Sequence, residues 1–306
     1  MKGDTGLSLA KANIAVILFG LSGLFGKLIE LSPLLIVLGR VLFASLTLAL
    51  VALATRTSLA PGSRRALATL AASGILLAFH WTTFFQSIQV STVAIGLVSF
   101  ATFPLFVVLL EALFLGEGLR LKNLLVALVT LAGAAIVAFG PGLGGQAAAG
   151  LAGAGLAMEG VLWGLASAAS FALLAILNKR SAGKLPSVAV AFYQDLSAAL
   201  VLTPLALLGL GRASSLGGAA FAWPGIQQLV LLAILGILCT ALAHTLFIAS
   251  LRGIKARTAA VLGSLEPLYG AIFAFLLLGE IPSPWTAAGG ILILGAAVYE
   301  STRSRP

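Results

Sequence analysis

The feature that most constrains this chain is its series of apolar runs, each near the length of about 20 residues that a helix needs to cross a bilayer. Hydrophobic residues make up 60% of the chain and charged residues 9%, whereas soluble domains carry about 25% charged residues. A water-soluble fold could not cover its surface with so little charge. The sequence therefore excludes a soluble enzyme, a secreted disulfide scaffold and a disordered chain, and predicts an integral membrane protein.

Dividing the chain at charge clusters and Pro/Gly breaks predicts ten membrane-spanning helices joined by short loops, an all-α integral membrane fold. No soluble domain fits between them. The predicted spans are 9–29, 33–54, 66–88, 92–115, 121–140, 157–178, 187–209, 226–250, 257–278 and 285–301.

The basic residues are concentrated in every second predicted loop. The net charge is +9, but the basic residues are scattered between apolar runs, which indicates membrane orientation and not nucleic-acid binding. With a cytoplasmic N-terminus, only Lys27 and Arg212 fall in outside loops. The pattern predicts a multi-pass protein with both termini cytoplasmic. An abundance of Ala, Gly and Leu and the lack of a transit peptide suggest a bacterial cytoplasmic (inner) membrane.

The two halves of the chain repeat each other. Pro104 and Pro267 each precede an apolar run that closes with Leu-Gly-Glu, at a constant offset of 163 residues. Each half holds five predicted spans, and because five is odd the second half must enter the membrane from the opposite side. We expect two inverted five-helix repeats, residues 1–142 and 156–306, joined by a Gly/Ala-rich linker at 143–155. This arrangement is typical of secondary transporters.

These residues resemble a known family. The stretch Phe19-Gly20-Leu21-Ser22 with Lys27, then Ser32-Pro33 followed by Arg40, and Leu-Gly-Glu after spans four and nine are similar to motifs of paired EamA domains in the drug/metabolite transporter (DMT) superfamily. The resemblance covers nearly the whole chain. Within the superfamily the chain looks most like the YddG-type aromatic amino-acid exporters. The resemblance implies amino-acid export through a central cavity.

Two predicted spans carry histidine at mid-membrane depth. His80 shares a face of span three with Phe84, and Trp81 is next to it. His244 lies in span eight at the position that the repeat aligns with Trp81. Ionisable groups at this depth are functional candidates, so we predict that His80, Trp81, Phe84 and His244 bind substrate. The alternative is that each histidine only hydrogen-bonds a neighbouring helix.

Other aromatic and hydroxyl side chains are further candidates. Trp163 and Ser167 share one stripe of span six, and an indole there could stack on an aromatic substrate. It could equally belong to the interfacial aromatic belt. Phe100 and Phe103 in span four are predicted to line the same cavity, with a lipid-facing position as the alternative.

Pro104 and Pro267 are predicted to lie inside spans four and nine, where each would kink its helix. Their symmetric placement makes them candidate hinges for opening and closing the cavity, although static proline kinks are also common in membrane helices.

Among the other ionisable residues within the predicted spans, four are further candidates. Arg40 and Asp195 lie at corresponding depths of spans two and seven, and Glu111 and Glu266 are candidate proton-carrying carboxylates. Related small multidrug pumps share a glutamate on helix one, but this chain has no acid between Asp4 and Glu30. Proton coupling by that route is not supported.

We expect a small-molecule transporter that lies in lipid and uses no cofactor, metal or nucleic acid. The single cysteine permits no disulfide or thiolate cluster. The alternatives are a broad-specificity drug or metabolite exporter and, more remotely, an intramembrane enzyme, although the sequence holds no HExxH, GxSxG or Walker motif. The sequence leaves open the substrate, energy coupling, net direction and oligomeric state, with a monomer as the working expectation.

Overall fold

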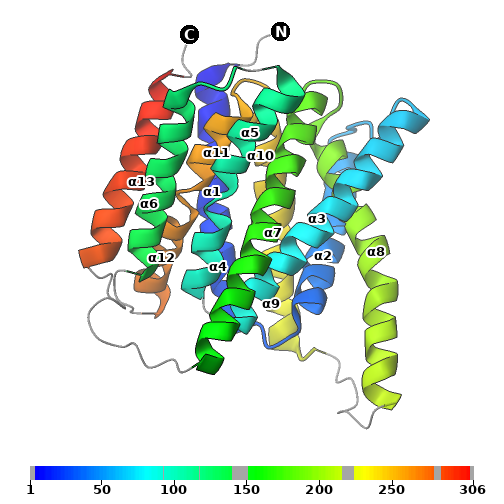
Figure 1. The fold of residues 1–306 in the computed structure, drawn as a ribbon. Helices are drawn as coiled ribbons and strands as arrows, with labels where there is room; N and C mark the ends of the chain where they lie inside the picture. The colour runs from blue at the N-terminus through cyan, green and yellow to red at the C-terminus, as the bar shows by residue number, and fades with distance from the viewer. Residues whose placement is uncertain are drawn as a thin grey trace.

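A computed structural model describes residues 4–91, 93–116, 118–139, 151–215, 224–278 and 284–303. Over these ranges the chain forms a bundle of helices without any β-strand; one isolated bridge joins Ala182 and Leu185 (Figure 1). Helices are expected in a bilayer because every backbone N–H and C=O must find a partner inside the protein.

The helices follow one another in two comparable series. In the first half they are α1 (Thr5–Leu28), α2 (Pro33–Ala54), α3 (Arg64–Val90), α4 (Val93–Phe100), α5 (Phe103–Leu115) and α6 (Leu121–Phe139). In the second half they are α7 (Leu151–Ser181), α8 (Ser187–Ser215), α9 (Ile226–Gly236), the π-helix η2 (Ile237–Leu242), α10 (Ala243–Ser250), α11 (Ala256–Gly263), α12 (Glu266–Leu278) and α13 (Pro284–Arg303).

Several segments are apolar and long enough to cross a bilayer. In the described ranges there are seven: Thr5–Gly26, Pro33–Ala54, Arg64–Val90, Met158–Ser181, Ser187–Leu208, Ile226–Ser250 and Ala256–Leu277. Shorter apolar helices accompany them at Phe103–Leu115, Leu121–Ile136 and Ala287–Glu300. The multi-pass membrane fold is therefore supported, whereas the total of ten spans stays a prediction.

Spans four and nine are broken, which corrects the expectation that they are continuous helices with prolines inside them. α4 ends before Ala101-Thr102, and α11 ends before Ser264-Leu265, 163 residues later. Pro104 and Pro267 are the second residues of the helices that follow, α5 and α12. Proline is tolerated there because the first N–H groups of a helix have no intrahelical partner. The prolines thus begin helices after a break and do not kink continuous ones.

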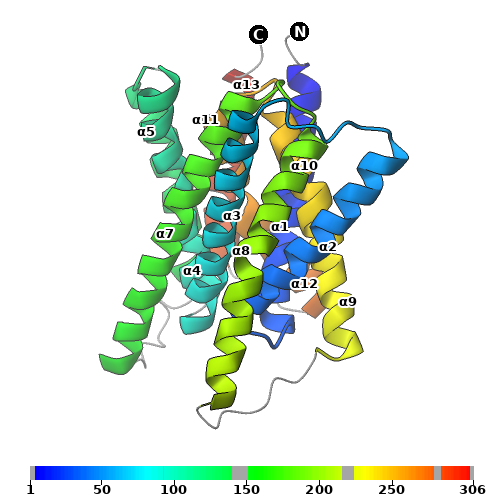
Figure 2. The ribbon, with the colours of Figure 1, turned by 90° about the vertical axis from the view of Figure 1, so that its right-hand side faces the viewer.

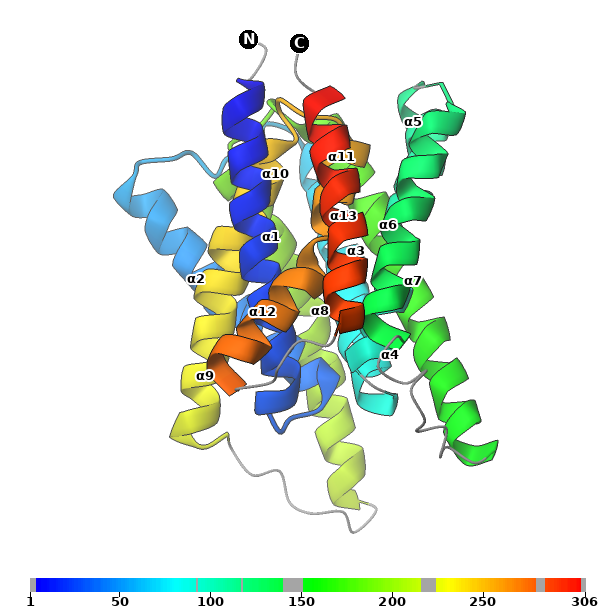
Figure 3. The ribbon, with the colours of Figure 1, turned by 90° about the vertical axis from the view of Figure 1, so that its left-hand side faces the viewer.

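The first helices of the two halves run in opposite directions, and helices of one half pack against helices of the other. α1 descends from the end of the bundle that holds both termini, whereas α7 rises towards it (Figures 1 and 3). α1 packs against α10 and α7 packs against α3, while α2 contacts α8 and α6 contacts α13 (Figure 2). Such symmetric pairings agree with the expected inverted repeat, which stays a prediction. Both termini lie at one end, as an even number of spans demands; which side of the membrane that end faces stays a prediction.

Parts of the sequence motifs fall outside the described residues. These are Glu117, Gly279-Glu280 and residues 143–150 of the expected linker. Residues 151–155, also assigned to the linker, form the first turn of α7 instead. A stretch of Ala, Leu and Gly without proline can continue a helix in an apolar environment.

Close helix contacts depend on small residues, as in other membrane bundles. At Gly20 in α1, an added Cβ would lie 2.6 Å from the Tyr269 Cβ and 3.0 Å from the Glu266 carbonyl oxygen of α12. One turn later, Gly23 has no neighbouring atom within 4 Å of such a Cβ. Gly20 therefore sets the distance between α1 and α12, and Gly23 does not.

We expect Gly20→Ala to lower the free energy of unfolding by about 1–3 kcal/mol, because the methyl group forces α1 and α12 apart. Gly23→Ala is the matched control in the same helix, and its better helix propensity should raise stability by up to about 1 kcal/mol. Unfolding of both variants in mixed detergent micelles measures the difference. Equal effects at the two positions would contradict the close contact at Gly20.

Candidate functional site

A narrow cavity of about 30 Å³ lies between α1, α2, α3, α4, α7, α10 and α12. It has room for about two water molecules. Its lining combines aromatic rings with ionisable groups: Phe19, Ser22, Arg40, His80, Trp81, Phe84, Phe100, Phe171, His244 and Glu266. Both halves of the chain contribute to it. A buried site of this composition between the two halves of a transporter is a candidate place for its substrate.

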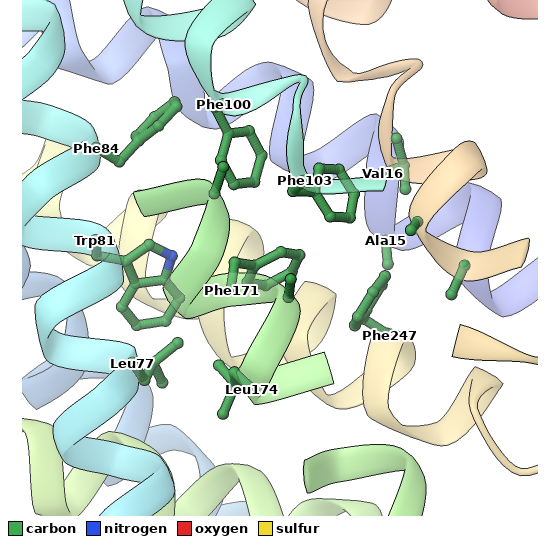
Figure 4. Close-up of a cluster of buried hydrophobic side chains, with 14 of the residues drawn as sticks. Ala15, Val16, Leu77, Trp81, Phe84, Phe100, Phe103, Phe171, Leu174 and Phe247 are labelled. Atoms are coloured by element: carbon green, nitrogen blue, oxygen red, sulfur yellow. The ribbon is translucent and has the colours of Figure 1, made fainter. Parts of the chain in front are cut away.

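One wall of the cavity is a cluster of aromatic rings (Figure 4). Phe171 of α7 lies at its centre, with ring centroids 5.6 Å from Phe100, 5.3 Å from Phe103 and 5.6 Å from Phe247. Phe100 and Phe103, on either side of the break between α4 and α5, stack with centroids 5.0 Å apart. The cluster thereby joins the broken helix of the first half to α7 and α10 of the second.

His80 is held in place by α7. Its Nδ1 lies 2.8 Å from the Ser167 hydroxyl oxygen and 3.1 Å from the Ser167 carbonyl oxygen. The Ser167 hydroxyl also donates to the His80 carbonyl oxygen at 3.1 Å. Because a carbonyl can only accept, the contacts indicate that Nδ1 carries the hydrogen. The imidazole is therefore fixed, with its ring centroid 4.7 Å from that of Phe171.

Arg40 is a fully buried cation on α2. Its guanidinium carbon lies 3.9 Å from the centroid of the Trp81 ring, a cation–π contact. Its Nε donates to the Thr240 hydroxyl at 2.9 Å, and its Nη2 donates to the Cys239 carbonyl at 3.4 Å. Both acceptors belong to η2, the π-helical segment of span eight. The π-helix therefore builds half of the Arg40 site.

Asp195 on α8 and His244 on α10 form a second buried pair. The Asp195 Oδ1 and His244 Nδ1 atoms are 3.9 Å apart, and both side chains are almost completely buried. Among the described residues, neither carboxylate oxygen and neither ring nitrogen has a hydrogen-bond partner. Arg40 is near enough to interact electrostatically with both groups. Polar groups left unsatisfied in an apolar interior are costly, so this pair is a functional candidate.

Glu266 adds a carboxylate to the lining of the cavity. It is the first residue of α12, directly after the break in span nine, and it is buried. A carboxylate in the first turn of a helix is stabilised by the helix dipole. The cavity thus offers one guanidinium and one carboxylate on different helices.

The structure brings together five of the eight predicted binding residues: His80, Trp81, Phe84, Phe100 and His244 line the cavity. Ser167 supports His80 from behind, and Phe103 packs behind Phe100. Trp163 is not among the lining residues: it is 36% exposed, and its indole Nε1 donates to Glu159 on the same helix at 3.2 Å. A substrate role for Trp163 therefore has no support from this geometry.

Five lining residues were not predicted as binding residues: Phe19, Ser22, Arg40, Phe171 and Glu266. Arg40 and Glu266 were recognised as ionisable residues of the spans but not placed in the site. Phe171 follows Ser167 by four residues, so the helical spacing put it on the face that holds His80. That spacing was the available signal for it.

A second ionic cluster includes Glu300, three residues before the end of α13, and this end of α13 lies at the end of the bundle that holds the termini (Figure 3). The Arg257 backbone N–H donates to Glu111 Oε1 at 2.9 Å, and its Nη1 lies 3.2 Å from Glu111 Oε2. Its Nε is 3.6 Å from Glu300 Oε1, and the Thr258 hydroxyl donates to the same oxygen at 3.0 Å. The cluster joins α5, α11 and α13.

A larger groove of about 660 Å³ opens outward between α2, α8 and α9. Its walls are almost entirely apolar, with leucines such as Leu42 and Leu46 that are exposed at the bundle surface. It lacks the placed polar groups that orient a metabolite. We therefore assign substrate binding to the smaller, polar cavity and not to this groove.

Comparison with known proteins places this architecture in a family. The profile of the EamA-like transporter family matches the chain twice, over residues 6–139 and 158–301. The chain belongs to the EamA-like transporter family. The two matches correspond to its two helical series, and membership makes the chain a multi-pass membrane transporter of the drug/metabolite transporter superfamily.

Named relatives of this EamA-like transporter are also transporters. It is 23% identical to the uncharacterized transporter YxxF of Bacillus subtilis, over 96% of this chain and 89% of the relative. It is 26% identical to an S-adenosylmethionine uptake transporter of Rickettsia bellii, over 74% of this chain and 69% of the relative. A crystal structure aligns over 97% of both chains with a TM-score of 0.76 and 21% identity, which shows a shared fold.

Proposed function

We propose that this EamA-like transporter exports small metabolites, with aromatic or other hydrophobic amino acids as its first candidates. Transport would proceed by alternating access through the cavity between two inverted repeats. In this proposal His80, Trp81, Phe84, Phe100, Phe171 and His244 contact the substrate, and Ser167 and Phe103 position them. No cofactor is required, because conformational change alone exposes the cavity to each side in turn.

The observation that carries this proposal is the pairing of charged and aromatic groups in one cavity. Arg40 offers a guanidinium, which suits a carboxylate. Glu266 offers a carboxylate, which suits an ammonium group, and the rings of Phe84, Phe100 and Phe171 supply an apolar wall. An aromatic amino acid carries these three features in one small molecule.

The volume of the cavity requires movement. A space for about two water molecules cannot hold an amino acid, so substrate binding must be accompanied by separation of the helices around it. The breaks before Pro104 and Pro267 lie next to the cavity, since Phe100 and Glu266 flank them and line it. We propose these two breaks, each with its proline, as the hinges.

A second candidate substrate is S-adenosylmethionine, which the Rickettsia bellii relative is named for taking up. It carries the same carboxylate and ammonium groups as an amino acid, together with a sulfonium cation and an adenine ring. The cation could lie against the faces of Phe84, Phe100 or Trp81 by cation–π contact. A broad-specificity drug or metabolite exporter is the remaining alternative.

Counterflow in proteoliposomes tests the proposal. Vesicles preloaded with unlabelled phenylalanine should take up labelled phenylalanine faster than empty liposomes, and a parallel set uses S-adenosylmethionine on both sides. Trp81→Phe should raise the half-saturating concentration by about three- to tenfold, because the smaller ring holds Arg40 and the substrate less well. Uptake rate against concentration gives this value.

Trp163→Phe is the matched control, because it makes the same change outside the cavity lining. Its half-saturating concentration should equal that of the unmodified protein. A large increase would indicate that Trp163 contributes to substrate binding. Uptake of S-adenosylmethionine without phenylalanine would replace the amino-acid proposal. Failure of both substrates with folded protein would favour the broader exporter.

A further inference from the structure

We propose that Asp195 and His244 form a proton-binding site, and that Arg40 links its occupancy to binding of a substrate carboxylate. The linkage rests on the proposed function, in which Arg40 receives that carboxylate. The proton site itself rests only on the geometry of the pair.

The geometry of the pair fits a site that holds one proton. The Oδ1–Nδ1 separation of 3.9 Å is too long for a hydrogen bond but places both groups within ion-pair distance. Asp195 is 0% exposed and His244 is 1% exposed, and neither has another hydrogen-bond partner among the described residues. A carboxylate and an imidazole so placed can share a proton that neither could hold as favourably alone.

Arg40 is the main charged group that acts on the Asp195–His244 pair. Arg40 comes from α2, His80 from α3, Cys239 from η2 and Glu266 from α12. On α8 itself, the neighbouring Gln194 side chain donates to Asn178 and not to Asp195. The His80 Nδ1 is engaged by Ser167, and the Cys239 carbonyl oxygen accepts from Arg40. The Arg40 guanidinium is therefore the positive charge available to balance an ionised Asp195.

The linkage follows from charge balance. Without substrate, the guanidinium of Arg40 compensates the Asp195 carboxylate, which lies outside the cavity lining, whereas Glu266 lines the cavity and can be solvated there. A substrate carboxylate at Arg40 takes over that compensation, and an uncompensated anion in a buried site is strongly disfavoured. The Asp195–His244 pair then binds a proton from solution and restores neutrality. Carboxylate and proton therefore bind together, and each promotes binding of the other.

The proton site can be tested without any substrate. The Trp81 and His244 ring centroids are 5.7 Å apart, so a protonated imidazole quenches Trp81 emission. In a variant with Trp163, Trp223 and Trp285 replaced by phenylalanine, emission should rise through a single midpoint as the pH is raised across the range in which the protein stays folded. Asp195→Asn should abolish this change, because His244 then lies beside Arg40 without an anion and stays neutral.

Two further variants identify which histidine causes the change in Trp81 emission. His244→Gln should also abolish the change, whereas His80→Gln should leave it, although the His80 centroid is 6.3 Å from that of Trp81. A titration that survives both Asp195→Asn and His244→Gln, or no titration at all in folded protein, would overturn the proton site.

The linkage is tested by proton uptake in weakly buffered detergent solution at a pH above that midpoint. Adding phenylalanine, or S-adenosylmethionine in a second set, should remove about one proton from solution per molecule bound. Asp195→Asn should still bind ligand without proton uptake. Glu30→Gln changes an exposed carboxyl that is not part of the cavity lining, and it should behave as the unmodified protein.

The outcomes separate the two proposals. Ligand binding without proton uptake in the unmodified protein would overturn the linkage and leave the proposed function standing. Absence of binding by both probes would count against the proposed function and against the linkage built on it, while the Trp81 titration would still decide the proton site.

Discussion

Arg40→Met is expected to abolish counterflow of carboxylate-bearing substrates and to lower the free energy of unfolding by about 3–5 kcal/mol. The guanidinium is the cation nearest to Asp195 and His244 in the described cavity, and it also stacks on Trp81 and donates to Thr240. Removing it leaves a buried carboxylate without compensation. It also removes the group that we propose binds the substrate.

A double variant separates these two losses. Arg40→Met combined with Asp195→Asn removes both charges, so most of the lost stability should return while transport remains absent. Arg40→Lys keeps the charge, but one ammonium cannot reproduce the separate contacts to Thr240 and Cys239, so weakened transport is expected. Unfolding in mixed micelles and counterflow measure the two quantities. Normal transport by Arg40→Met would show that the carboxylate binds elsewhere.

The helical membrane fold was predictable from the sequence because it depends on composition and spacing. Runs of apolar residues can span a bilayer in only a few ways, and the offset of 163 residues between Pro104 and Pro267 recurs in the bounds of the helices around them. The breaks before these prolines were not predicted. A proline indicates that a helix is interrupted, but not whether it bends the helix or begins a new one.

The site was predicted less completely, for physical reasons. Periodicity identifies which residues share a helix face, which is sufficient for His80 and Phe84 on α3. It does not show which helices meet, so the contact between Arg40 and η2, 200 residues away in sequence, could not be derived. The π-helix has no clear sequence signature. For Trp163 the residue type favoured a binding role, whereas the structure places its indole outside the cavity lining and hydrogen-bonded to Glu159.

The cluster of Arg257 with Glu111 and Glu300 leads to the second prediction with a large expected effect. These residues join α5, α11 and α13 at the end of the bundle that holds the termini. α5 and α11 are the segments that lie between the two helix breaks and the end of the bundle that holds the termini (Figure 1). If the breaks are hinges, the cluster holds the moving segments together at this end and stabilises the narrow state of the cavity.

Replacing Glu111 and Glu300 with glutamine should therefore increase access to the cavity. Bonds from arginine to carboxylates contribute about 1.5–3 kcal/mol each, so the loss of both should raise the open population by roughly 10²- to 10⁴-fold. Ser22→Cys in a Cys239→Ser background places one thiol in the cavity lining. Its rate of modification by a water-soluble maleimide reports the opening.

The matched control is Glu30→Gln in the same background, an exposed carboxyl outside the cluster, which should leave the modification rate unchanged. Unfolding measurements separate local opening from general loosening. In a variant that opens at the hinges, the thiol should be modified faster. The main unfolding transition should shift little, because α1, α2, α3, α7 and α8 keep their contacts. An unchanged rate of thiol modification in the double glutamine variant would show that the cluster does not control opening of the cavity. The hinge assignment would then rest on the breaks at Pro104 and Pro267 alone.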